Sequence, residues 1–227
     1  MIPVIIGVSF LVFFIMDLAP GDAVDILAPE GATAEDLEAI RHDLGLDQPV
    51  IVRYVKYMGG MLHGDMGVSY VSKTDVFDTY MEKLPATIKL SFASILVSIL
   101  LSVPLGIYSA TRQGTVQDNI SMIVAMIGLS MPNFWLGLLL IIVFSLNLGW
   151  FPSGGDQTLS SIVLPAITIG TGLMATLTRT TRSSMLDVLK QEYLRTARAK
   201  GIPEKIVITS HALRNALIPI ITIIGTQ

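Results

Sequence analysis

The residue types that carry out chemistry in proteins are sparse in this 227-residue chain and form no catalytic or metal-binding pattern. There is no cysteine, which excludes disulfides and thiolate metal sites. The histidines His42, His63 and His211 are far apart and match no metal-ligand spacing. Serines recur at helical spacing from Ser91 to Ser102, but no histidine accompanies them in an apolar run, which argues against an intramembrane serine protease. We therefore expect no catalytic residue, no metal site and no cofactor in this chain.

The composition indicates an integral membrane protein. Hydrophobic residues make up 52% of the chain and charged residues only 15%, and the mean hydropathy is +0.65. The apolar runs are continuous rather than alternating, which favours membrane-crossing helices over a β-barrel. No GxxxxGK[S/T] phosphate loop occurs, so the chain does not bind ATP by that route. We expect an all-α polytopic membrane protein with no nucleic-acid partner and no enzymatic activity of its own.

Five apolar segments are predicted to be membrane helices. They cover residues 2–18, 86–110, 120–148, 161–178 and 212–227. The first is interpreted as a membrane helix rather than a signal peptide, because no small-residue cleavage site follows it. Asp17 and Lys89 each lie within about a turn of the predicted membrane boundary, where a long or polar side chain reaches water. We expect both to be interfacial anchors rather than parts of an ion pathway.

The charges of two polar segments predict the orientation of the chain in the membrane. Residues 19–85 contain five basic and twelve acidic residues, whereas residues 179–214 contain eight basic and three acidic residues. Basic residues are enriched in cytoplasmic loops, so the second segment is predicted to be cytoplasmic. Three predicted spans separate the two segments, so residues 19–85 form an outer loop and the N-terminus is cytoplasmic.

The third predicted span contains an unusual sequence in its middle, SMPNFWLG at residues 130–137. Pro132 removes a helical hydrogen bond, and Asn133 adds an amide that needs a partner. One interpretation is a kink that packs against neighbouring helices. The other is a helix break that lines a polar cavity and contacts cargo, and it makes Ser130, Pro132, Asn133 and Trp135 candidates for a translocation path.

A polar helical pair follows the fourth predicted span. Helical propensity is high from residue 181 to residue 200, Gly201-Ile202-Pro203 ends that helix, and a second helix is predicted over residues 204–214. A basic helix beside a membrane can bind anionic lipid. Small residues followed by a turn favour close docking against a protein groove instead. We expect this helical pair to offer a surface to a soluble partner.

The sequences EYLRTARAKG (192–201) and HALRNALIP (211–219) resemble the coupling motif of permeases, the membrane subunits of binding-protein-dependent ABC importers. The general motif is Glu-Ala-Ala, three residues and Gly, with an Ile-x-Leu-Pro ending. Ala197, Gly201 and Leu213 follow it closely, and the other positions look like the dipeptide/oligopeptide branch. Six further segments resemble that branch in the same order: 17–22, 44–49, 64–67 with Ser69, 85–87, 134–137 and 149–152.

The resemblance implies the ABC importer permease fold, a single membrane domain with six helices. About five of the six lie within residues 1–227, and the short basic segment usual before the first helix is not among them. We therefore expect segments to be missing at both ends of this chain. The location implied is the cytoplasmic (inner) membrane of a bacterium or archaeon, in a multi-pass arrangement.

The resemblance also implies a function and partners. Residues 179–214 would be a cytoplasmic coupling segment that docks on ABC ATPase subunits, which hydrolyse ATP in place of this chain. A second homologous permease would complete the pore, and an extracytoplasmic solute-binding protein would deliver cargo, with lipid around the spans. The residues expected to dock on the ATPase are Glu192, Arg195, Thr196, Ala197, Arg198, Ala199, Lys200, Gly201, His211, Leu213, Arg214 and Asn215.

Several alternatives stay open at the level of the sequence. Within the branch, the cargo expected is a short peptide, and a nickel chelate, glutathione or an oligosaccharide are the alternatives. An ion-coupled secondary transporter would need charges in the middle of its spans or inverted repeats, and neither is evident. A membrane scaffold that recruits a soluble enzyme would need no water-accessible residues around Asn133 and Trp135.

Overall fold

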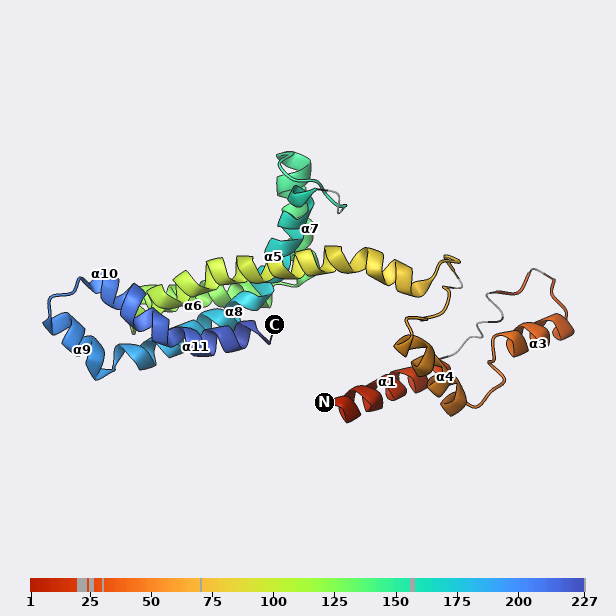
Figure 1. The fold of residues 1–227 in the computed structure, drawn as a ribbon. Coiled ribbons are helices and arrows are strands. Elements are labelled where there is room, and N and C mark those ends of the chain that lie inside the picture. Colours follow the sequence, from red (N-terminus) through yellow and green to blue (C-terminus); the bar gives the residue numbers. More distant parts are fainter. Residues whose placement is uncertain (20–23, 25–26, 30, 70, 156–157, 227) are drawn as a thin grey trace. The chain divides into compact units, whose positions relative to one another are not determined.

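The computed structural model describes residues 1–19, 24, 27–29, 31–69, 71–155 and 158–226 (Figure 1). Pro20–Asp22 in the first motif of the resemblance and Gln227 at the end of the last predicted span lie outside these residues. The chain divides into two compact units, Met1–Leu84 and Pro85–Gln227. In the described residues helices dominate, and an isolated antiparallel bridge pairs Val68 with Asp75.

Aromatic contacts hold the first unit together. Helix α1 (Ile2–Asp17) packs on α4 (Val50–Leu62), where the Tyr54 ring meets Phe10 edge-on with centroids 5.1 Å apart. The Tyr54 hydroxyl lies 2.8 Å from Ser9 Oγ. Asp17, predicted as an interfacial anchor, forms an ion pair with Arg53. The carboxylate at the end of α1 is therefore neutralised within the unit.

A capping box begins helix α3 (Ala34–Asp43) of the first unit, and Thr33 and Asp36 form it. The Asp36 amide donates to Thr33 Oγ1 at 3.3 Å, and the Thr33 amide donates to Asp36 Oδ2 at 2.9 Å. These bonds satisfy two amides that the first turn of a helix leaves free. Gly45, at φ +64°, ends the helix in the left-handed conformation.

The second unit is a bundle of long helices with α8 in contact with several of the others (Figure 1). Helix α5 begins before this unit and continues into it. The elements are α5 (Val76–Thr111), α6 (Val116–Ser130), α7 (Asn133–Leu140) with the π-helix Ile141–Asn147, the 3₁₀ turn Leu159–Ile162 with α8 (Val163–Leu189), α9 (Glu192–Ala199), α10 (Glu204–Ile206) and the π-helix Val207–Ala212 with α11 (Leu213–Ile224).

Glycines on α5 and α6 allow the backbone of α8 to approach these two helices closely. A Cβ on Gly106 of α5 would lie 2.9 Å from the Thr178 carbonyl oxygen of α8. A Cβ on Gly128 of α6 would lie 2.9 Å from the Thr171 carbonyl oxygen. Small residues such as glycine allow such contacts between membrane helices, because no side chain separates the two backbones. Gly106 and Gly128 are therefore packing positions between helices.

Among the serines of α5 from Ser91 to Ser102, one bonds between helices. Ser102 Oγ donates to the Met174 carbonyl of α8 at 3.2 Å. Ser91 and Ser94 instead donate to the carbonyls of Thr87 and Leu90 in their own helix, and Ser98 Oγ is buried with no hydrogen-bond partner among the described residues. Two of these four serines are therefore satisfied within α5, by carbonyls four residues earlier in the chain.

Three described helical stretches are long and apolar enough to cross a membrane: Val76–Thr111, Leu159–Leu189 and Glu204–Ile224. A fourth candidate is the pair Val116–Ser130 and Asn133–Asn147, which bends by 96° within the predicted span 120–148. The first predicted span forms α1, with 16 residues, against the roughly 20 that a straight crossing needs. The chain is an all-α polytopic membrane protein.

Gly106→Ala tests the close approach of α5 and α8. The added Cβ would lie 2.6 Å from Thr181 Cβ, so we expect overpacking to cost about 1–3 kcal/mol and to lower the thermal unfolding midpoint in detergent. Gly137→Ala is the matched control, because its Cβ would lie 3.6 Å from Thr168 Cγ2, an ordinary contact. Equal midpoints for the two variants would contradict the packing assigned to Gly106.

Candidate functional site

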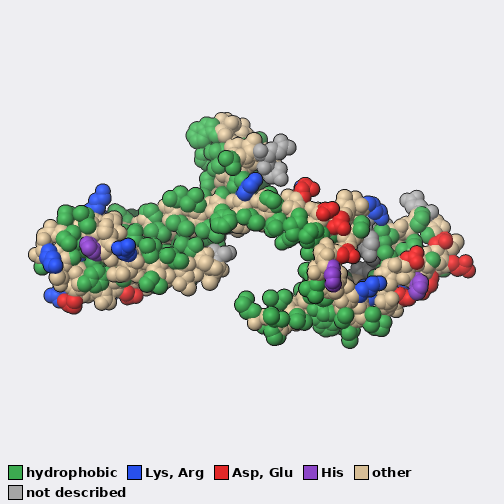
Figure 2. Space-filling view, in the orientation of Figure 1, with side chains coloured by type: hydrophobic (Ala, Val, Ile, Leu, Met, Phe, Trp, Pro, Cys, Tyr) green, Lys and Arg blue, Asp and Glu red, His purple; other side chains and the backbone are tan. Residues whose placement is uncertain are grey.

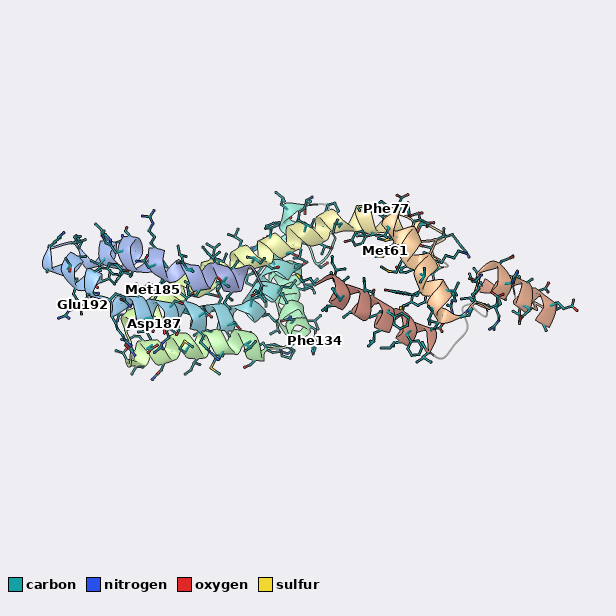
Figure 3. The ribbon with its side chains drawn as sticks, turned by 60° about the horizontal axis from the view of Figure 1, so that its bottom comes forward. Met61, Phe77, Phe134, Met185, Asp187 and Glu192 are labelled. Atoms are coloured by element: carbon teal, nitrogen blue, oxygen red, sulfur yellow. The ribbon has the colours of Figure 1, made fainter. Side chains whose placement is uncertain are left out.

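The predicted docking helix, α9, rests on an apolar core at one end of the second unit. Leu194 is fully buried and Ala197 is 8% exposed, and both belong to a cluster that Ala110, Met185, Val207, Ala212 and Ala216 complete. Figure 3 shows Met185 among the helices that meet there and Glu192 at the start of α9. One side of α9 thus packs into this cluster, whose other members come from α5, α8, the π-helix Val207–Ala212 and α11, and the other side is exposed.

Gly201 turns the chain sharply after α9. Its φ is +77°, its amide donates to the Arg198 carbonyl at 2.9 Å, and the Ile202 amide donates to the Ala197 carbonyl at 3.3 Å. These two bonds are those of a Schellman motif, which satisfies the last carbonyls of a helix. Ile202 then packs against the apolar cluster. The prediction that this helix ends at Gly201 is confirmed, and the structure places Gly201 in the left-handed conformation.

Ion pairs cover the exposed side of this turn. Arg198 Nη2 donates to Glu204 Oε1 at 2.8 Å and Arg198 Nε to Glu204 Oε2 at 3.0 Å, so one bidentate pair joins α9 to α10. The hydrogen bonds that Arg198 donates to this carboxylate raise the pKa of Arg198, which stays charged. Arg195 pairs with Glu192 at 2.9 Å on the same helix. Such exposed pairs contribute little stability, about 0–1 kcal/mol each, but they fix where the charges lie.

Tyr193 ties α9 to α11. Its hydroxyl donates to the His211 carbonyl at 3.2 Å and accepts from Asn215 Nδ2 at 2.6 Å. The His211 carbonyl belongs to the π-helix Val207–Ala212, whose wider winding leaves carbonyls free for side chains. The two sequences that the resemblance singled out are therefore joined by direct hydrogen bonds.

The structure brings the predicted docking residues to one end of the unit but does not expose all of them. Ala197 is buried in the apolar cluster on which α9 rests, which we call the seat of α9. His211 and Leu213 are half-buried. The exposed members are Glu192, Arg195, Thr196, Arg198, Ala199, Lys200, Gly201, Arg214 and Asn215. Lys and Arg side chains gather over this end, and hydrophobic side chains cover the helices beside it (Figure 2).

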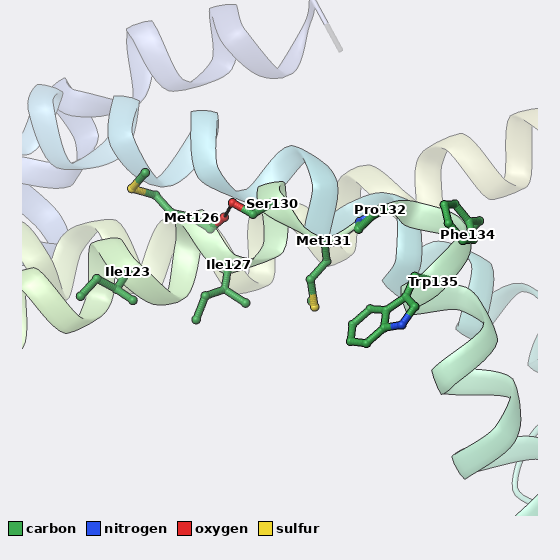
Figure 4. Close-up of a pocket in the computed structure, with 8 residues that line it drawn as sticks. All are labelled: Ile123, Met126, Ile127, Ser130, Met131, Pro132, Phe134 and Trp135. Atoms are coloured by element: carbon green, nitrogen blue, oxygen red, sulfur yellow. Dashed lines mark hydrogen bonds between the residues drawn. The ribbon is translucent and has the colours of Figure 1, made fainter.

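The predicted translocation residues lie at the bend between α6 and α7. Helix α6 ends at Ser130, Met131 and Pro132 adopt extended conformations, and Asn133 begins α7. A hollow of about 570 Å³ lies beside the bend, and it is lined by Ile123, Met126, Ile127, Ser130, Met131, Pro132, Phe134 and Trp135. Ile127, Met131 and Trp135 point to the same side (Figure 4). Ser130, Pro132 and Trp135 therefore share one surface.

This hollow differs from the polar cavity that the sequence suggested. Its lining is almost entirely apolar, and Ser130 Oγ is already bonded to the Met126 carbonyl at 2.9 Å. Asn133 does not line it and lies against α8, where a Cβ on Gly172 would be 3.3 Å from Asn133 Oδ1. The physical reason is that a 96° bend exposes the apolar outer faces of both helices.

Comparison with known proteins identifies the family. Residues 102–227 match the family described as "Binding-protein-dependent transport system inner membrane component". Residues 1–91 match the description "Binding-prot-dependent transport system membrane comp, N-term". The chain belongs to this family. It is a permease of a binding-protein-dependent ABC importer and a multi-pass inner membrane protein, in agreement with the resemblance of its motifs.

Curated relatives of this permease match it along nearly the whole chain. The oligopeptide transport system permease protein AppB of Bacillus subtilis (strain 168) is 44% identical over 99% of this chain and 74% of its own length. The glutathione transport system permease protein GsiC of Escherichia coli (strain K12) is 39% identical over 100% of this chain and 74% of its own length.

The sequence analysis missed a buried ion pair in the permease, because its two residues lie just outside the predicted spans 120–148 and 161–178. Arg182 of α8 donates to Asp118 of α6 through Nε at 2.8 Å and Nη2 at 2.6 Å, and Asp118 is 3% exposed. The sequence around Asp118 does contain a pattern that marks the start of a helix. Thr-x-x-Asp at Thr115–Asp118 repeats the capping pattern at Thr33–Asp36.

Gly201→Val tests the turn after α9. A β-branched residue at φ +77° costs about 1–2 kcal/mol, although a Cβ there meets no atom within 4 Å. We expect amide hydrogen exchange over residues 197–203 to become about 5–30-fold faster. Gly201→Asn is the control, since Asn tolerates this conformation and should exchange close to the wild-type rate. Wild-type exchange in the valine variant would contradict the strain argument.

Proposed function

We propose that this permease is the transmembrane subunit of an ATP-driven importer for short peptides, coupled through the turn of α9 and α10 to a cytoplasmic ATPase subunit. One observation carries the proposal: α9 is fixed to the bundle by its apolar side and presents a charged, small-residue side to the exterior of the chain. Such a helix can transmit movement only if a partner binds its free side. In this proposal ATP is hydrolysed on that separate subunit.

The contacts of α9 suggest how docking would move the spans. Its seat includes Ala110 at the end of α5, Met185 in α8 and Ala216 in α11. A displacement of α9 by closing ATPase subunits would therefore push on three long helices at the same time. We propose that this movement switches the permease between inward-facing and outward-facing states, with ATP binding as the source of free energy.

The remaining partners follow from the family and from the surface of the permease. We propose that a second homologous permease completes the pore, and that an extracytoplasmic solute-binding protein delivers cargo on the side of residues 19–85 and 149–160. The acidic surplus of residues 19–85 favours a basic surface on that partner. The apolar hollow beside Pro132 would be covered by membrane lipid or by the second permease.

Peptide cargo is supported by what the relatives are named for, oligopeptide in one case and glutathione in the other. A nickel chelate or an oligosaccharide is the alternative within the same fold. The full-length permease, tagged and gently solubilised, should co-purify with an ATPase subunit and a second permease. The assembled complex in proteoliposomes should take up short peptides in an ATP-dependent way. Ion-dependent uptake by the permease alone would overturn the proposal.

Orientation can be tested by labelling, because the chain contains no cysteine. We propose a cytoplasmic N-terminus, which places exposed Ser72 outside and exposed Lys190 inside. In intact cells, a membrane-impermeant thiol reagent should label Ser72→Cys and leave Lys190→Cys unlabelled. Both variants should react after the membrane is opened. The reverse pattern in intact cells would invert the topology and place α9 away from any cytoplasmic ATPase.

Arg198→Glu tests docking on the exposed side of α9. Reversing this charge should lower recovery of the ATPase subunit by about tenfold, equivalent to ~1.4 kcal/mol. The variant also breaks the pair with Glu204, so the double variant Arg198→Glu/Glu204→Arg is the control that rebuilds the pair in reverse. Continued loss in the double variant assigns the arginine to the partner. Full recovery would assign it to the turn itself, and unchanged recovery in the single variant would point to lipid.

A further inference from the structure

An ion pair buried beside the seat of α9 joins elements that are distant in the sequence. Asp118 lies in the first turn of α6 and Arg182 lies 64 residues later in α8. The carboxylate also accepts from Ser109 Oγ of α5 and from the Gly114 amide at 3.0 Å. Its two oxygens therefore receive four donors from α5, the turn before α6, and α8.

The chemistry of this cluster is specific to a carboxylate and a guanidinium. Two parallel N–H···O bonds require a planar fork, which lysine lacks. The Ser109 and Gly114 donors face the carboxylate and would not accept a cation. Asp118 is 3% exposed and the Arg182 side chain is 27% exposed, so removal of either charge leaves the other poorly solvated.

The position of the pair links it to α9. Ser109 precedes Ala110, and Arg182 lies one helical turn before Met185, and both of these neighbours belong to the apolar cluster that seats α9. We infer that Asp118 and Arg182 are positioning residues for coupling: they lock the turn between α5 and α6 to α8, so that movement of α9 is transmitted to α6. The inference rests on the proposed function, because it concerns how force from the ATPase reaches the spans.

Without the pair, α9 would still share the apolar cluster with α5, α8, the π-helix Val207–Ala212 and α11. Helix α6 would remain against α8 through the close approach at Gly128, but the turn that begins it would be free to slide. Helix α6 leads into the bend at Pro132. The pair therefore belongs to the route between the docking surface and that bend.

The test measures coupling rather than the amount of protein. The full-length permease in its assembled transporter is compared as wild type, Asp118→Asn and Arg182→Lys, with Arg179→Lys as the matched control at an exposed position of the same helix. The readout is the number of peptides imported per ATP hydrolysed, together with hydrolysis stimulated by the loaded binding protein. We expect this ratio to fall about 2- to 30-fold in both variants, the range for residues that modulate coupling, and to stay unchanged in the control.

A double variant separates positioning from simple stability. Asp118→Asn/Arg182→Met removes both charges, so no uncompensated charge remains and assembly should recover. A ratio that stays low in this variant supports the inference. A ratio at the wild-type value in the single variants, or restored in the double variant, would overturn it. Failure of the wild-type complex to couple ATP to uptake would instead overturn the proposed function.

Discussion

The close approach of helix backbones around α8 is the constraint on which the second unit depends. Gly106 of α5 and Gly128 of α6 meet backbone carbonyls of α8 at distances that no other residue allows without movement. In a membrane the hydrophobic effect does not drive helices together, so van der Waals contact between such surfaces takes its place. Because α8 also carries Met185 and Arg182, the same packing sets the position of the apolar seat and the buried ion pair.

The end of this bundle combines two kinds of interaction with different roles. The apolar contacts of Leu194 and Ala197 hold α9 on the bundle, and such contacts have no preferred direction. Directional contacts then fix the orientation: Tyr193 bonds to the His211 carbonyl and to Asn215, and Gly201 closes the Schellman turn. These contacts give α9 a fixed orientation on the bundle.

The bend between α6 and α7 shows how the same chain makes an opening in a packed bundle. Pro132 cannot donate a backbone hydrogen bond, so the helix stops at Ser130 and restarts at Asn133. The second helix then leaves at 96° and uncovers an apolar hollow beside Trp135. An apolar surface of this size in a membrane protein suits contact with lipid or another subunit better than contact with a charged solute.

Features that depend on neighbouring residues or on overall composition can be read from the sequence alone. These include the membrane class, the capping residues Thr33 and Asp36, the helix end at Gly201 and the motifs that identify the family. Which helices face one another is known from the folded chain alone. In the structure Ala197 is buried, Asn133 lies away from the hollow, and Asp118 pairs with Arg182. Those outcomes depend on contacts between segments far apart in the chain, and no local spacing of residues encodes them.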